Sequence, residues 1–288
     1  NNGVMTARDL AEYEVLAREP LKNRFGPWQL ATNPAPAVGG ATLSAMLTLL
    51  EHQPMRAWTP QETDRLARIM AAVLRHRFDY LDLADDPHAA VSSLLAQAGR
   101  GAIATRNGSA ATVNTAAADR DGLACTITMS AGYGAGVIPP GTGLWMNNCL
   151  GEIELNRRGL IAGPTGTRLS SNMAPTVGRT REGDILAIGS PGADRITSAL
   201  VQTLANHVQQ DMPLPEAIEH PRLHVELLTD GERVAYERGV PVERLSLPSR
   251  ECAPLSMFFG GVGAVRVSAD GQFQIGADAR RLGGTASG

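Results

Sequence analysis

The sequence predicts a layered α+β fold, in which helices pack against antiparallel sheets. Helix start signals and apolar residues at three- and four-residue spacing fill the first third, and short β-rich runs with glycine-bearing turns begin at residue 112. The turns between these runs are tight, as in hairpins, whereas a parallel sheet needs long crossovers. No repeat or linker divides the 288 residues, so we expect one domain.

Helices are expected at four places in the first third. The clearest start signal is Thr59-Pro60-Gln61-Glu62, because threonine can cap a helix and proline fits its first position. The helix behind it carries its apolar residues on one face: Leu66, Ile69, Met70, Val73 and Leu74. The other helices are expected over residues 7–15, 41–52 and 89–97, and a strand over residues 28–31.

The rest of the chain is expected to be mainly strands. Asp119-Arg120-Asp121-Gly122 is a hairpin turn signal, and a later hairpin over residues 257–277 turns at Asp270-Gly271. One long helix follows Gly192, with apolar residues at four-residue steps. The other strands are predicted over residues 112–118, 124–130, 144–147, 174–177 and 185–188.

Composition excludes several classes of function. A net charge of −3 without a basic cluster argues against nucleic-acid binding, and no apolar run is long enough to span a bilayer. Lys22 is the only lysine and lies in a polar stretch, so a Walker-type phosphate loop or a Schiff base has no candidate. The cysteines are Cys125, Cys149 and Cys252, which form neither a paired framework nor a C-x-x-C metal site.

Two polar turns are candidate anion sites. Gly189-Ser190-Pro191-Gly192-Ala193 leads from a strand into a helix, where consecutive backbone N–H groups can hold an oxyanion. The alternative is an ordinary turn in which Asp194 caps the helix. Leu169-Ser170-Ser171-Asn172 places two hydroxyls before a strand, where they can bind a carboxylate or form a polar turn.

The histidines are expected to be structural. His220 and His224 are four residues apart, but Pro221 prevents them from sharing one helical face as metal ligands. His76, Asp79 and Asp82 are expected to lie on a solvated face at or near the end of the long helix.

Thr112 is a candidate nucleophile that needs no histidine, lysine or metal. It lies between a loop-ended helical segment and a strand, so cleavage before it would give one residue a hydroxyl and a free α-amine. Such an amine titrates near pH ~8, so part of it is neutral at physiological pH and can accept the hydroxyl proton.

Several short motifs follow one another along the chain: Gly3-Val4-Met5-Thr6, Arg18-Glu19-Pro20, Pro34-Ala35-Pro36, Asp119-Arg120-Asp121-Gly122, Tyr133-Gly134-Ala135-Gly136, Gly141-Thr142-Gly143, Asn147-Asn148, Leu169-Ser170-Ser171, Gly189-Ser190-Pro191-Gly192, Pro221-Arg222-Leu223-His224 and Gly276-Ala277-Asp278-Ala279-Arg280. In this order they resemble the γ-glutamyltranspeptidase family (glutathione hydrolases), which belongs to the N-terminal-nucleophile hydrolases. The resemblance implies a four-layer αββα sandwich. It also implies that residues 1–111 are the later part of a large subunit and residues 112–288 the small subunit of a self-cleaved heterodimer.

The resemblance assigns the reacting groups. Thr112 is implied as the nucleophile released by self-cleavage, with its α-amine as the general base. Ser130 lies close to the family hydroxyl that hydrogen-bonds the nucleophile, and Thr128 is the alternative. The N–H groups of Gly192 and Ala193 are implied as the oxyanion hole.

The resemblance also assigns the donor site. Ser170 and Ser171 are implied to hold the donor α-carboxylate, and Glu152, or alternatively Glu154, the donor α-amino group. The family's carboxylate-binding arginine belongs to the front of the large subunit, which we do not expect in this chain. Cys149 stands where the family has a glutamine.

The implied activity is autocatalytic release of Thr112 followed by cleavage of the γ-glutamyl amide of glutathione or related compounds, with transfer to water, an amino acid or a peptide. The resemblance implies no cofactor and no metal, and a periplasmic or extracellular location whose export signal would lie upstream. Val113 and Asn114 differ from the Thr-His that follows the nucleophile in familiar members. Two alternatives therefore stay open: an acylase for glutaryl or poly-γ-glutamyl amides, and an unprocessed binding protein of the same fold.

Overall fold

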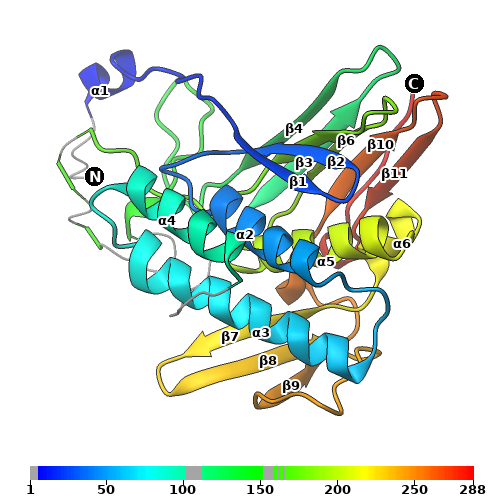
Figure 1. Cartoon of the computed structure of the whole chain (residues 1–288). Helices are drawn as coiled ribbons and strands as arrows, with labels where there is room; N and C mark the ends of the chain where they lie inside the picture. Colours follow the sequence, from blue (N-terminus) through cyan, green and yellow to red (C-terminus); the bar gives the residue numbers. More distant parts are fainter. Residues whose placement is uncertain (1–5, 102–111, 152–158, 161–162, 165) are drawn as a thin grey trace.

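The computed structural model describes residues 6–101, 112–151, 159–160, 163–164 and 166–288 (Figure 1). Its main element is a six-stranded antiparallel sheet in the order β1-β2-β5-β6-β10-β11. The strands are β1 (Leu21–Phe25), β2 (Trp28–Thr32), β5 (Thr176–Arg179), β6 (Ile185–Gly189), β10 (Gly263–Val267) and β11 (Phe273–Ala277). This sheet carries the loop that follows β6.

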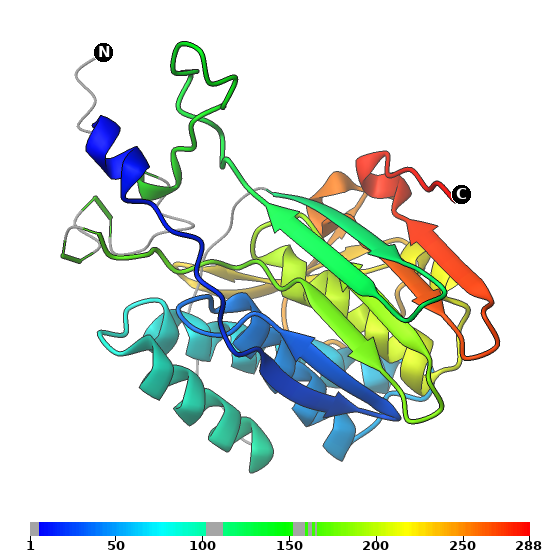
Figure 2. The same ribbon diagram turned by 90° about the horizontal axis from the view of Figure 1, so that it is seen from above.

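A second, two-stranded sheet covers one face of the main sheet. It is the hairpin of β3 (Val113–Ala118) and β4 (Ala124–Met129), whose strands overlie β6 and β10 (Figure 2). Small residues of the hairpin, such as Ala116 and Ala124, pack on Ala187, Val265 and Val267 of the main sheet. The two strands alternate between half-buried and exposed residues, as a sheet with one covered face requires.

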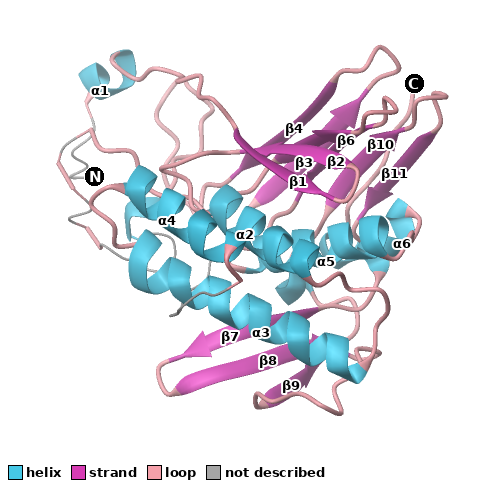
Figure 3. Cartoon of the chain, viewed as in Figure 1, coloured by secondary structure: helices cyan, strands magenta, loops and turns pink. Residues whose placement is uncertain are grey.

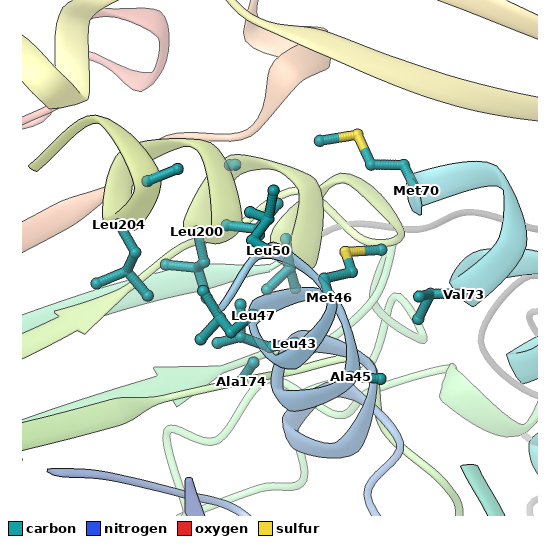
Figure 4. Packing of buried hydrophobic residues seen from close by; sticks show 14 of the residues in the cluster. Leu43, Ala45, Met46, Leu47, Leu50, Met70, Val73, Ala174, Leu200 and Leu204 are labelled. Atoms are coloured by element: carbon teal, nitrogen blue, oxygen red, sulfur yellow. The ribbon is translucent and has the colours of Figure 1, made fainter. Parts of the chain in front are cut away.

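Helices cover the opposite face of the main sheet. Helix α2 (Gly39–His52) and helix α5 (Arg195–Gln209) lie side by side and supply Leu43, Met46, Leu47 and Leu50 from α2 and Leu200 and Leu204 from α5 to the core (Figure 4). Helix α6 (Leu214–Glu219) packs against β11. The principal hydrophobic core lies between this face of the sheet and the helices.

A further layer lies beyond these helices. Helix α3 (Pro60–His76), which continues as a π-helical turn (Arg77–Leu81), and helix α4 (Pro87–Gly99) both pack against α2. Below α3 lies the small sheet of β7 (Leu223–Leu228), β8 (Gly231–Glu237) and β9 (Ser249–Cys252) (Figure 3). The short helices are α1 (Ala7–Ala11) and three single turns, Cys149–Gly151, Met257–Phe259 and Ala279–Arg281.

The predicted α+β class is confirmed, and most predicted elements are present within a few residues. The helix expected over residues 7–15 is shorter, and the strand expected over residues 144–147 is wrong, because this stretch is an exposed loop. The sequence did not predict β1 or the β7–β8–β9 sheet. Among the described residues, the hairpin, the main sheet and the helices α2 and α5 are stacked in this order, and α3, α4 and the small sheet lie beyond them. No described helix covers the outer face of the hairpin.

The described part of the chain contains no helix that is long and apolar enough to cross a membrane. It also contains no group of three or more histidine, cysteine, aspartate or glutamate side chains that could hold a metal ion.

Two arginines are buried with two carboxylates where the last strands meet β7 and β8. Arg280 donates to Glu237 with Nε at 2.8 Å, and Arg222 Nη1 lies 2.7 Å from Asp278 Oδ2. Glu237 also accepts the backbone N–H groups of Arg222 and Ser256. All four charged side chains are nearly inaccessible to solvent, so each depends on the others for compensation.

We predict that Glu237→Ala lowers the free energy of unfolding by about 3–5 kcal/mol, because it leaves two buried arginines with Asp278 as the one remaining carboxylate of the group. Glu251→Ala removes a carboxylate from an exposed pair with Arg238 and should cost less than about 1 kcal/mol. Denaturant unfolding of the two variants gives the comparison, and equal losses would contradict the buried network.

Candidate active site

A cavity of about 650 Å³ brings together residues from widely separated parts of the chain. Thr112, Ser130, Ser170 and Ser171, all expected site residues, line it. The segment before β1, the turn after β2 and the loop before β5 supply the remaining walls. The cavity is therefore the candidate active site.

The β3–β4 hairpin positions Thr112 and Ser130 opposite each other. Val113 pairs with Met129 at the end of the ladder, so Thr112 and Ser130 are the next residues outward on the two strands. The alternation of the strands directs Asn114 and Thr128 toward the main sheet, and Thr112 and Ser130 share that face.

Thr112 is 9% exposed and Ser130 is half-buried, so both hydroxyls lie at the wall of the cavity and not on the outer surface. Ser130 Oγ accepts the N–H of Gly132 at 3.1 Å. Thr128, the alternative to Ser130, pairs with Asn114 inside the ladder and does not line the cavity.

The serine turn, Leu169–Met173, is held against the start of α2. The carbonyl of Ser171 accepts the N–H groups of Val38 and Gly39 at 2.8 and 3.0 Å. Gly39 is required there, because a Cβ at this position would lie 2.1 Å from the carbonyl oxygen of Asn172. Asn33 ties the same turn to β2 by donating to the carbonyl of Met173 at 2.8 Å.

The loop from Ser190 to Asp194 joins β6 to α5 and is completely buried. Neither Gly192 nor Ala193 donates its N–H in a hydrogen bond within the described part of the chain, as an oxyanion hole requires. Both have left-handed backbones, with φ of +128° and +60°. For Ala193 this conformation is strained, and no local sequence signal predicted it.

This loop does not line the 650 Å³ cavity, but it starts where the hairpin touches the main sheet. The side chain of Asn114 occupies the space beside Gly189, the last residue of β6, where a Cβ would lie 2.1 Å from Asn114 Oδ1. Asn114 is two residues after Thr112, so the start of β3 and the start of the loop lie together.

Asp194 does not cap α5, so the alternative prediction of an ordinary turn with Asp194 as the helix cap is wrong. Its side chain makes no cap hydrogen bond and is drawn instead to Arg77 and Asn172. Burial raises the pKa of Asp194 to about 6, although the Arg77 guanidinium opposes this shift.

The cavity has a positive character. Arg18 and Arg168 line it, and its described lining includes no aspartate or glutamate. Arg168 lies over the ring of Tyr13 and donates to the carbonyl of Glu14, which fixes the chain before β1 beside the serine turn. Glu152 and Glu154, the expected partners of a substrate amine, lie outside the described residues.

The histidines lie away from this cavity. His224 hydrogen-bonds Ser198 at 2.9 Å and His220 stacks on Trp58, which confirms their structural roles. The solvated face expected around His76 and Asp82 is wrong, because both side chains are buried. Asp82 is buried because it forms an ion pair with Arg77, which also pairs with the distant Asp194. The helix periodicity could not predict this long-range contact.

The fold is that of the N-terminal-nucleophile hydrolases. A solved structure of cephalosporin acylase from Bacillus halodurans superimposes with a TM-score of 0.71 at 19% identity, covering 99% of this chain and 55% of that one.

The sequence matches the family described as Gamma-glutamyltranspeptidase over residues 1–288, so the chain belongs to this family. It is 26% identical to the glutathione hydrolase proenzyme of Escherichia coli, over 98% of this chain and 54% of that protein. It is 27% identical to an acylase ACY 1 proenzyme of Pseudomonas sp. over 99% of this chain and 54% of that protein. The chain thus spans about half the length of these relatives.

We predict that Gly192→Ala lowers the free energy of unfolding by about 2–6 kcal/mol, from backbone strain and overpacking together. The added Cβ would lie 2.6 Å from the Cα of Gly260. A backbone atom cannot relieve this clash by a change of rotamer, as a side chain can. Gly122→Ala is the control, because φ is +92° there but nothing lies within 4 Å of the added Cβ. It should cost about 1–3 kcal/mol, and a larger loss than for Gly192→Ala in thermal or denaturant unfolding would contradict the packing described.

Proposed function

We propose that this chain forms the nucleophile-bearing part of an autoprocessing γ-glutamyl hydrolase or transferase. The observation that supports it best is one cavity lined by Thr112 and Ser130 together with the Ser170-Ser171 pair. Residues 1–111 belong to the large subunit and residues 112–288 to the small subunit in this proposal. Cleavage before Thr112 then creates the α-amine that the reaction needs.

The proposed mechanism uses only groups of the chain. The α-amine of Thr112 accepts the hydroxyl proton as Oγ1 attacks the γ-amide carbonyl. The oxyanion that develops receives the N–H groups of Gly192 and Ala193, which are otherwise unoccupied in the described structure. The protonated amine returns its proton to the leaving amine, and water or an amino acid or peptide then releases the γ-glutamyl group from Thr112.

The charge of the cavity supports an acidic acyl group. A γ-glutamyl donor carries an α-carboxylate, and the Ser170 and Ser171 hydroxyls can donate hydrogen bonds to it. Arg18 and Arg168 add favourable positive potential around the same cavity. The proposal assigns the donor α-amino group to Glu152, with Glu154 as the alternative.

We expect Thr112→Ala to abolish both self-cleavage and hydrolysis of a γ-glutamyl anilide, with a loss of activity on the order of 10³-fold or more. Denaturing intact mass of the full-length precursor and its variant reports the cleavage, and the smaller piece should hold residues 112–288. Thr112→Ser keeps a hydroxyl and should retain both reactions at reduced rate.

Thr115→Ala is a control on the exposed face of β3 and should leave both reactions unchanged. A Thr112→Ala precursor that still breaks before residue 112 would contradict the proposal. A wild-type precursor that stays in one piece would instead support the unprocessed binding protein.

A second candidate is an acylase for glutaryl amides, favoured by the similarity to an acylase proenzyme. A glutaryl group lacks the α-amine that Glu152 is proposed to bind. Glu152→Gln should therefore raise KM about tenfold for a γ-glutamyl anilide, which corresponds to the loss of one charge-assisted hydrogen bond. The KM for a glutaryl anilide should stay unchanged. Steady-state kinetics with both anilides tests this. Wild-type preference for the glutaryl substrate would favour the acylase.

A further inference from the structure

Four buried polar side chains form a continuous bridge behind the cavity. Asn172 Nδ2 donates to Asp194 Oδ1 at 2.8 Å, and Arg77 Nη1 donates to the same oxygen at 2.9 Å. Arg77 also donates with Nε and Nη2 to the two carboxylate oxygens of Asp82, at 3.1 and 3.2 Å. None of the four is more than 7% exposed.

The bridge joins segments that are distant in sequence. Asn172 belongs to the serine turn. Asp194 is the last residue of the loop from Ser190 to Asp194, which we call the oxyanion loop after its proposed role. Arg77 is the first residue of the π-helical turn after α3, and Asp82 directly follows that turn. Arg77 and Asp194 are separated by 117 positions. A buried ion pair contributes little net stability, but its directional hydrogen bonds fix how the groups lie relative to each other.

Asp194 is the member that reaches both parts of the proposed site. It directly follows Ala193, whose backbone is held at φ +60°, and it binds the residue that directly follows Ser171. Because its carboxylate is used for this purpose, it does not cap α5. One side chain therefore links the loop after β6 to the serine turn.

We propose that Asp194 is a positioning residue that sets the distance between the oxyanion loop and the serine turn, acting through Asn172 on one side and through Arg77 on the other. The inference rests on the proposed function for its catalytic meaning. Its structural content, that the two turns are coupled through Asp194, can be tested without turnover.

The first test measures amide hydrogen exchange in the full chain. Asn172→Ala removes the link to the serine turn but leaves the Arg77–Asp194 pair intact. We expect residues 189–196 to exchange about tenfold faster in this variant, the factor for losing one hydrogen bond to a charged group. Unchanged exchange in residues 189–196 would overturn the proposal.

Asn33→Ala is the matched control. Asn33 also lines the cavity and makes a 2.8 Å hydrogen bond to the serine turn, but it has no bond to Asp194. Faster exchange should be confined to residues 169–174 in this variant. An equal effect of both variants on residues 189–196 would mean that any loosening of the turn spreads to the loop, and the specific role of Asp194 would be rejected.

The second test uses kinetics and rescue. Asp194→Ala should lower kcat about 100-fold, as loss of an oxyanion donor does, and also raise KM, because both parts of the site are displaced. Asp194→Asn keeps an acceptor oxygen for Asn172 and Arg77, and should recover at least tenfold of the lost kcat. Equal kcat in the two variants would overturn the positioning role.

The two tests separate the two claims. An inactive wild-type protein with coupled exchange would reject the proposed function and retain the coupling. An active protein in which Asn172→Ala leaves residues 189–196 unchanged would retain the function and reject the coupling.

Discussion

Burial of strand β6 on both faces is the constraint on which the rest of the structure depends. Leu186 and Ile188 enter the core formed with the helices, whereas Ala187, between them, packs under the β3–β4 hairpin. Each face needs its cover, since an exposed face would leave these side chains in water. The end of β6 is consequently fixed in position, and so is the loop that begins after Gly189. The hairpin that carries Thr112 packs on the same strand, so β6 positions both the proposed nucleophile and the loop.

The second constraint is electrostatic. The chain buries two separate groups of arginines and carboxylates, one around Glu237 and one around Asp194. Both join elements that no local sequence signal connects, but they differ in what they adjoin. The group around Glu237 ties the last strands to β7 and β8, and the group around Asp194 lies next to the proposed oxyanion loop. A buried group of paired charges adds little net stability compared with an apolar core of the same size, so the position of Asp194 beside the proposed site favours a role in geometry.

The sequence predicted those features that local pattern determines. Apolar spacing located α3 and α5, and the turn at residues 119–122 predicted the hairpin whose register places Thr112 opposite Ser130. Strand β7 was missed because its buried residues are consecutive and include His224, so it lacks the alternation of a half-exposed strand. The buried Arg77 and Asp82 were missed for a related reason. Charged residues at a helix end indicate solvent exposure until a distant partner, here Asp194, is known.

Precision in the proposed site must come from backbone contacts and a few polar side chains, because Thr112, the proposed nucleophile, lies at the start of a short hairpin. A reacting constellation has to be held within roughly 0.5 Å of its productive geometry. The Asn114 side chain meets β6 at Gly189, the Ser171 carbonyl accepts two N–H groups at the start of α2, and Asp194 connects the two turns. The Asn114 amide fills the space beside Gly189 and hydrogen-bonds Thr126 on β4. This contact joins the hairpin to the main sheet two residues after Thr112 and at the start of the proposed oxyanion loop, so it aligns the two.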